Sequence, residues 1–181
     1  MQPTLIVITG HPGSGKTSIA RQLAVKNHLL YLTKDAFKER IFDGLGSSDK
    51  DWSLKVSGVA HRIMDDIIEQ ELANGHSVIV ESNFKPEIDS ERFSKLAQKY
   101  RATTLQILCQ ASTDELFKRW QERIAKGQRH EGHVEAISLE QIRRDREVPY
   151  PPLVLPGKTI TIDTTDFATV AIPDLNEILA E

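Results

Sequence analysis

The chain has 181 residues, of which 39% are hydrophobic and 27% are charged, and its formal net charge is −3. These values are typical of a soluble globular domain, and the slight negative charge makes nucleic acid an unexpected partner. The single cysteine, Cys109, leaves no intrachain disulfide and closes an apolar run, so we expect a buried thiol and a reducing, cytoplasmic setting. No apolar run approaches the length of a membrane span, and no membrane association is expected.

Apolar runs and helical patterns alternate along the chain. The expected strands cover residues 4–9, 29–33, 77–82, 104–109 and 158–163. The expected helices cover about residues 15–26, 54–74, 87–100, 112–124 and 174–179. Asn74-Gly75 supplies a helix stop, and Ser112 with Glu115 forms a capping-box pattern. This alternation predicts an α/β fold with a parallel sheet covered on both faces, in one domain spanning residues 1–181.

Two polar stretches interrupt the alternation. Residues 43–52 are rich in glycine and serine and are expected to form a long loop. Residues 126–135 are polar, basic and punctuated by glycine. Loops of this kind on an α/β frame often act as lids or contact substrates.

One short stretch predicts phosphate binding. The residues that follow the first strand fit G-x-x-x-x-G-K-[ST] at every fixed position: Gly10, His11, Pro12, Gly13, Ser14, Gly15, Lys16 and Thr17. Glycines let successive N–H groups face one concavity, and the helix that follows, which includes Ser18, adds its positive dipole end. Lys16 is expected on the β- and γ-phosphates and Thr17 on Mg²⁺. The loop is therefore predicted to bind a nucleoside triphosphate.

Two other classes of P-loop protein are disfavoured. A GTPase should carry a guanine-reading [NT]-K-x-D, and the sequence has only "TKDA" from Thr33, in which the aspartate is misplaced. An oligomeric ATPase motor is usually larger and ends a strand in an acidic pair, whereas a single acid, Glu81, ends the strand here.

Four patches of sequence resemble one family, the small P-loop kinases. They are the P-loop, "YLTKDAFKERIF", "VIVESNF" and "RWQERIAKGQRHEGH". The family, often described as AAA-type ATP-binding kinases, includes gluconate-kinase-like and chloramphenicol-phosphotransferase-like proteins, zeta toxins and polynucleotide kinases. The resemblance implies a three-layer α/β/α P-loop fold, a five-stranded parallel sheet of order 2-3-1-4-5, and a lid of helix and loop over about residues 116–146. It also implies ATP and Mg²⁺ as cofactors.

Asp35 matches the family's aspartate that follows the second strand and accepts the proton of the acceptor hydroxyl. A carboxylate at the carboxyl end of a strand lies where open α/β sheets bind ligands, which suits that role. Asp35 could also cap a helix that begins at Ala36, and the two roles are compatible.

Glu81 ends the third strand, which in the resembling kinases neighbours the P-loop strand like a Walker B strand. Its expected role there is to support Mg²⁺ through water or to bind the acceptor. An ordinary solvated strand end is the alternative.

Arginines mark the expected lid. Arg119 and Arg123 lie four residues apart on one helix face, and Arg129 follows in the polar loop. An arginine can bind phosphate oxygens with two N–H groups, so we expect at least one to contact the phosphates, in the order of preference Arg123, Arg119, Arg129. The alternative is a solvated helix in which Glu115 pairs with Arg119. His130 and His133 are interpreted as polar lid surface rather than as zinc ligands.

The leading hypothesis is an ATP-dependent, Mg²⁺-dependent kinase that phosphorylates the hydroxyl of a small molecule, as a monomer or homodimer. Its catalytic residues would be Lys16, Asp35, Arg123 and Arg119. The alternatives are a polynucleotide 5′-hydroxyl kinase, a zeta-toxin-like sugar-nucleotide kinase, or an ATP-binding regulatory module without catalysis.

Overall fold

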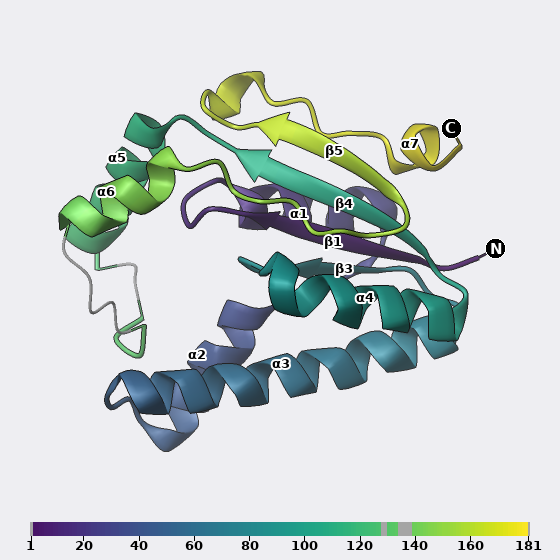
Figure 1. Ribbon diagram of the computed structural model, residues 1–181, viewed down its shortest axis with the longest axis horizontal. Coiled ribbons are helices and arrows are strands. Elements are labelled where there is room, and N and C mark those ends of the chain that lie inside the picture. The colour runs from purple at the N-terminus through teal and green to yellow at the C-terminus, as the bar shows by residue number, and fades with distance from the viewer. Residues whose placement is uncertain (1, 128–129, 134–138, 181) are drawn as a thin grey trace.

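The computed structural model describes residues 2–127, 130–133 and 139–180, and its centre is a five-stranded parallel sheet of order β2-β3-β1-β4-β5 (Figure 1). The strands are β1 (Thr4–Gly10), β2 (Leu30–Thr33), β3 (Val78–Glu81), β4 (Thr103–Gln110) and β5 (Lys158–Asp163). The predicted fold class and strand order are both confirmed.

Helices cover both faces of the sheet, because side chains alternate between the faces along each strand. Leu5 and Val7 of β1 pack with α3 (Lys50–Ala73) and α4 (Pro86–Tyr100) on one face. Ile6 and Ile8 pack with α1 (Lys16–Asn27) and α7 (Leu175–Ala180) on the other. Every residue of β1 is buried, as expected for a central parallel strand. Cys109 is buried, as predicted, and it packs on the α1 side of the sheet.

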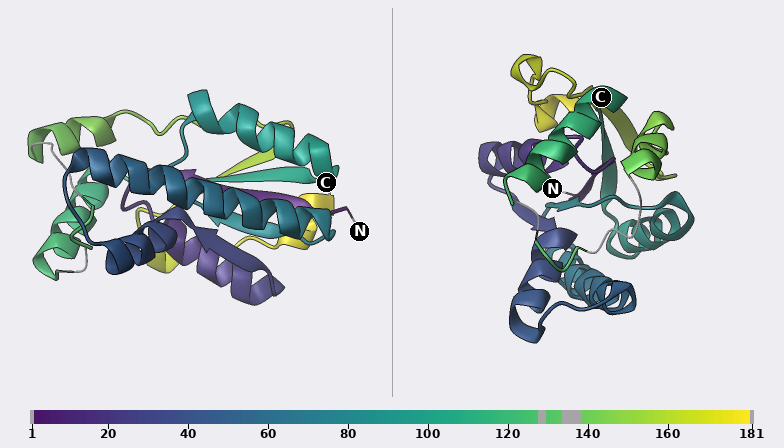
Figure 2. Two further views of the ribbon diagram at one scale, coloured as in Figure 1. Left: turned by 90° about the horizontal axis from the view of Figure 1, so that it is seen from below. Right: turned by 90° about the vertical axis from the view of Figure 1, so that its left-hand side faces the viewer.

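The carboxyl ends of the strands share one end of the sheet, and the two chain termini lie at the opposite end (Figure 1). Three further helices gather near those carboxyl ends: α2 (Lys34–Leu45), α5 (Thr113–Ala125) and α6 (Leu139–Glu147). Helices α5 and α6 pack together on one side, and α2 packs on α3 on the other, as the views in Figure 2 also show. No helix among the described residues is long and apolar enough to cross a membrane.

The chain between α6 and β5 is fastened to β4. The buried side-chain amide of Gln106 accepts from Leu153 N at 2.7 Å and donates to Leu153 O at 3.1 Å. Gly157 passes so close that a Cβ there would lie 1.8 Å from the carbonyl oxygen of Thr104. We call residues 148–157 the return segment, because they bring the chain back from α6 to the sheet.

The prediction of a long loop over residues 43–52 is wrong. Helix α2 continues to Leu45, and α3 begins at Lys50, four residues before the expected start at Leu54. Asp49 caps α3 by accepting from Trp52 N at 2.9 Å, and the Trp52 indole donates to Gly46 O at 2.9 Å. These local hydrogen bonds stabilise a short turn where glycine and serine content predicted a loop.

The alternative in which Asp35 caps a helix that begins at Ala36 is wrong. Helix α2 begins at Lys34, and its cap position is Thr33, so Asp35 lies inside the first turn. A short 3₁₀ helix, η1 (Phe167–Thr169), and the charged helix α6 were not expected from the sequence pattern.

Candidate active site

The P-loop turn lies between β1 and α1, and close approaches explain its glycines. Gly10 has φ 146°, and a Cβ there would lie 2.2 Å from the carbonyl oxygen of Cys109. Gly15 has φ 76°, and a Cβ there would lie 2.6 Å from the Phe167 ring. Both positions favour glycine on conformation as well as on space. The backbone therefore takes a path that side chains would block.

Lys16 and Ser14 are held within this turn. The Lys16 ammonium donates to Gly10 O at 3.0 Å and to His11 O at 2.8 Å. Burial lowers the pKa of Lys16, while the negative charge of Glu81 opposes that shift. Ser14 is buried, and its carbonyl accepts from the Thr164 hydroxyl at 2.9 Å, which joins the turn to the segment after β5.

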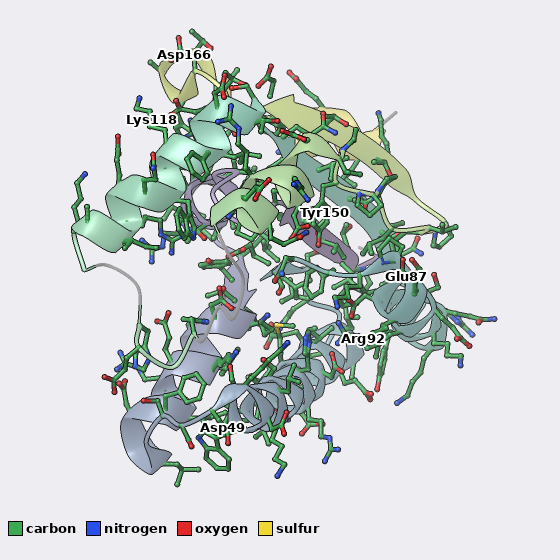
Figure 3. All side chains as sticks on the ribbon, turned by 60° about the vertical axis from the view of Figure 1, so that its left-hand side comes forward. Asp49, Glu87, Arg92, Lys118, Tyr150 and Asp166 are labelled. Atoms are coloured by element: carbon green, nitrogen blue, oxygen red, sulfur yellow. The ribbon has the colours of Figure 1, made fainter. Side chains whose placement is uncertain are left out.

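A cavity of about 560 Å³ opens beside the P-loop. One side of it is lined by Pro12, Gly13, Gly15, Lys16, Thr17 and Ser18. Helix α5 contributes Arg119, Glu122 and Arg123, and Lys126 follows them. Helix α2 contributes Lys34, Asp35, Lys38 and Glu39. Figure 3 shows polar side chains that project from α5 toward α2, the two helices that face each other across this cavity.

Thr17 and Glu81 meet at the carboxyl end of the sheet. The Thr17 hydroxyl donates to Glu81 Oε2 at 3.1 Å, and the Tyr31 hydroxyl donates to the same oxygen at 3.2 Å. Burial and the Glu81 charge raise the pKa of Tyr31, so Tyr31 stays a donor. Two oxygen ligands beside the phosphate-binding turn are a donor set that fits Mg²⁺, which takes few protein ligands and keeps several waters. Among residues 2–127, 130–133 and 139–180, no cluster of three or more His, Cys, Asp or Glu could hold a metal by itself.

Asp35 lies in the wall of the cavity opposite the P-loop. Its side chain is 59% exposed, and Lys34 Nζ lies 3.6 Å from Oδ1. Partial desolvation raises the pKa of Asp35, but Lys34, His133, Lys16 and Lys38 together lower it below the ordinary value. The carboxylate is therefore ionised at neutral pH, with the Lys34 ammonium beside it.

The two predicted lid arginines differ sharply. Arg119 donates from Nε to Glu115 at 2.9 Å and from its terminal nitrogens to Gly13 O at 3.2 Å and Thr164 O at 2.7 Å. The Glu115–Arg119 pair, which was the alternative interpretation, is present, and the guanidinium also ties α5 to the P-loop. Arg123 is exposed, lines the cavity, and has no hydrogen bond or ion pair with any side chain in the described part of the chain. Arg129 lies outside the described residues.

His11 lies in the P-loop, but its ring points away from the cavity. Its Nε2 forms a hydrogen bond with Val148 O at 2.8 Å, and its ring makes an edge contact with Tyr150 at 5.0 Å between centroids. Tyr150, labelled in Figure 3, lies just after α6 and donates to Phe84 O at 2.8 Å. His11 therefore joins the nucleotide loop to the return segment, a role that its place in the motif did not indicate.

The described part of the polar loop lies against α2. His130 stacks on Phe42 with centroids 5.6 Å apart, and a Cβ on Gly132 would lie 2.2 Å from the same ring. His133 Nε2 is 3.0 Å from Glu39 Oε1. Both histidines line the cavity, whereas the sequence indicated only polar surface of the lid.

Sequence reasoning missed most of the α2 side of the cavity. Lys34 adjoins Asp35, and Lys38 and Glu39 lie one helical turn further along, on the same face of α2. That spacing was visible in the sequence once Asp35 was singled out. Ser53 of α3 comes to the cavity only through the packing of α3 on α2.

Comparison with known proteins identifies the family of the chain. A family model described as an AAA domain, AAA_33, matches residues 5–149. The chain belongs to this AAA domain family. A crystal structure of a "putative kinase" from Chloroflexus aurantiacus J-10-fl is 42% identical, with a TM-score of 0.88, and the match covers 99% of this chain and 96% of that one. A search of curated proteins found no match.

More distant structures share the fold. A sugar kinase from Janibacter sp. HTCC2649 is 18% identical with a TM-score of 0.53, and the match covers 90% of this chain and 86% of that one. The APS kinase CysC from Mycobacterium tuberculosis, solved with AMPPNP and APS, is 17% identical with a TM-score of 0.53, and the match covers 89% and 90%. The chain therefore has the fold of P-loop kinases, as the sequence patches predicted.

Proposed function

We propose that the chain is a single-domain ATP-dependent kinase that phosphorylates a hydroxyl group of a small molecule. The observation that carries this proposal is the placement of Asp35 across one cavity from Lys16, Thr17 and Arg123. A nucleotide-binding module needs only the P-loop side, whereas a kinase also needs a carboxylate facing the transferred group.

The proposed reaction is a direct transfer. The bond between the γ-phosphorus and the β,γ-bridging oxygen breaks, and a bond forms between that phosphorus and the acceptor oxygen. Asp35 accepts the hydroxyl proton, and ADP leaves. A lowered pKa suits Asp35 for this role, because the transition state of such transfers is loose and asks the carboxylate mainly to orient the hydroxyl.

The other residues bind and orient the phosphates. Lys16 would exchange its two carbonyl acceptors, Gly10 O and His11 O, for phosphate oxygens. Thr17 and Glu81 would hold Mg²⁺, which supplies charge neutralisation at the phosphates. Arg123 would place its guanidinium on the transferring group, while Arg119 keeps α5 on the P-loop.

The proposal is tested by measuring ADP release from Mg-ATP with a panel of hydroxyl compounds, with and without Asp35→Asn. We expect the variant to lose about 100-fold or more in turnover, because general base catalysis contributes on this scale, while ATP binding measured by calorimetry is kept.

Asp66→Asn is the matched control, because Asp66 is an exposed aspartate on α3. ATP binding without turnover on any compound would favour the regulatory-module alternative. Retained turnover in Asp35→Asn would remove Asp35 from the chemistry.

A further inference from the structure

The side of the cavity that faces the P-loop is rich in charge. It comprises Lys34, Asp35, Lys38 and Glu39 of α2, together with Asn83 after β3 and His133, and we call it the acceptor side. Donors and acceptors of hydrogen bonds make up this wall, which suits a ligand that carries several hydroxyl groups. The whole cavity of about 560 Å³ must also take the phosphates of ATP, so the acceptor that fits is small.

Most charged groups on the acceptor side already have close partners. Glu39 is 3.0 Å from His133 Nε2, and Lys38 Nζ donates to the Ser53 hydroxyl at 2.8 Å. Lys38 is also buried, at 8% exposure, beside the Phe42 ring. These groups hold α2, α3 and residues 130–133 together.

Lys34 differs from them. Its Nζ is 3.6 Å from Asp35 Oδ1 and 3.4 Å from Asn83 Oδ1, and both separations exceed those of strong charge-assisted hydrogen bonds, about 2.7–2.9 Å. An ammonium has three donor hydrogens, so Lys34 retains capacity for a further oxygen ligand. Its side chain is only 14% exposed, which places this charge in the cavity wall rather than in bulk water.

The charges around Asp35 are consistent with a further oxygen ligand on Lys34. Although partial desolvation raises the pKa of Asp35, its neighbours, three lysines with Lys34 foremost and also His133, lower it overall. A cation, the Lys34 ammonium, therefore lies close to the place where an acceptor hydroxyl would meet Asp35. An acceptor with an anionic group near its reactive hydroxyl gains from that charge, and a neutral acceptor does not.

We propose that the acceptor is a small polyhydroxylated compound that carries a carboxylate or phosphate group, and that Lys34 Nζ binds this anionic group while Asp35 faces the hydroxyl. The inference rests on the proposed kinase function and names the substrate class for the same site. Lys34 is then a specificity-determining residue one position before the base.

The first test compares matched acceptors with the full chain at saturating Mg-ATP. The pairs are a hexose with its aldonic acid, and a polyol with its monophosphate, so that the two arms separate carboxylate from phosphate recognition. We expect kcat/KM to be at least about tenfold higher for the anionic member of one pair. Equal or better use of the neutral members would overturn the proposal.

The second test uses Lys34→Met, which removes the charge and keeps the aliphatic stem. We expect KM for the anionic acceptor to rise about 10–100-fold, with KM for ATP unchanged and partial rescue in Lys34→Arg. Lys55→Met, at an exposed lysine on α3, is the control and should match the unaltered chain. A rise in KM for ATP, or an equal loss with neutral and anionic acceptors, would show that Lys34 serves the phosphates or Asp35 and would overturn the proposal.

Failure of the underlying function gives a different result. If ATP binds but neither pair nor the wider panel releases ADP, the kinase proposal itself fails. If neutral compounds alone are phosphorylated, the kinase proposal stands and the anionic acceptor is wrong.

Discussion

Glu81 has two expected roles, which are to support Mg²⁺ or to bind the acceptor. Its Oε2 accepts from Thr17 at 3.1 Å and from Tyr31 at 3.2 Å, so one carboxylate oxygen faces the expected Mg²⁺ position. We expect Glu81→Gln to raise the Mg²⁺ concentration needed for half-maximal activity by about tenfold or more, since groups that orient metal ligands contribute on this scale. A Mg²⁺ titration at saturating ATP measures the effect.

Glu91→Gln is the control, because Glu91 is an exposed glutamate on α4 that pairs only with Lys95 among the groups described. An unchanged Mg²⁺ requirement together with a raised KM for the acceptor would place Glu81 in the acceptor site instead.

The two arginines of α5 are expected to have different roles, although they lie on the same helix. Arg119 is bound by a carboxylate and by backbone carbonyls of the P-loop and of the segment after β5, whereas Arg123 is exposed at the cavity. We expect Arg119→Ala to lower the free energy of unfolding by about 2 kcal/mol, because it removes charged hydrogen bonds, and to weaken ATP binding. We expect Arg123→Ala to change stability by less than about 0.5 kcal/mol and to lower kcat about 10–100-fold.

Urea denaturation and steady-state kinetics on the same two proteins separate the effects, and each variant serves as the control for the other. The assignment would be wrong if Arg119→Ala proved as stable as the unaltered chain, or if Arg123→Ala kept full turnover.

Element boundaries show where sequence patterns work and where they do not. The five strands were predictable because four contain an apolar run and β5, KTITID, alternates isoleucine with polar residues, and the expected and observed bounds differ by only a few residues. Helix α6 was not predicted, because its sequence LEQIRRDRE is mostly charged and lacks an apolar stripe. The short turn between α2 and α3 depends on Asp49 and Trp52, whose hydrogen bonds form only in the folded chain.

At the scale of the whole molecule, His61 links stability to pH. Burial, followed by the charges of Arg92 and Lys34, lowers the pKa of His61 to about 4, although Asp89 and Asp35 oppose the shift. Between about pH 6.5 and pH 4 the unfolded chain binds a proton at this residue and the folded chain does not. The free energy of unfolding should therefore fall as pH decreases through that window. Urea denaturation at a series of pH values measures this slope.

His61→Gln should reduce the slope, and His76→Gln, at an exposed histidine, is the control. Burial raises the pKa of Asp65 and acts in the opposite direction, so the comparison of variants rather than the total slope isolates His61. An identical slope in His61→Gln and the unaltered chain would contradict the assignment.

The nucleotide side of the site was more predictable than the acceptor side. The P-loop is contiguous in sequence, so its fixed spacing alone named Lys16 and Thr17. The acceptor side is assembled from α2, α3, the end of β3 and residues 130–133, which meet only through tertiary packing. Lys34 precedes Asp35 in the sequence, but only the fold shows that its Nζ lies 3.4 Å from Asn83 Oδ1.

The two hydrogen bonds between Gln106 and Leu153 fix one end of the chain segment that carries α5 and α6. Helix α5 begins shortly after β4 ends, and the return segment from α6 is clamped back onto the same strand. The chain between the end of β4 and the return segment is therefore closed into a loop, and its ends are held together whether or not a substrate is bound. Most of the entropy of joining its ends is lost when the sheet forms, so a ligand that binds against α5 meets no further cost of loop closure.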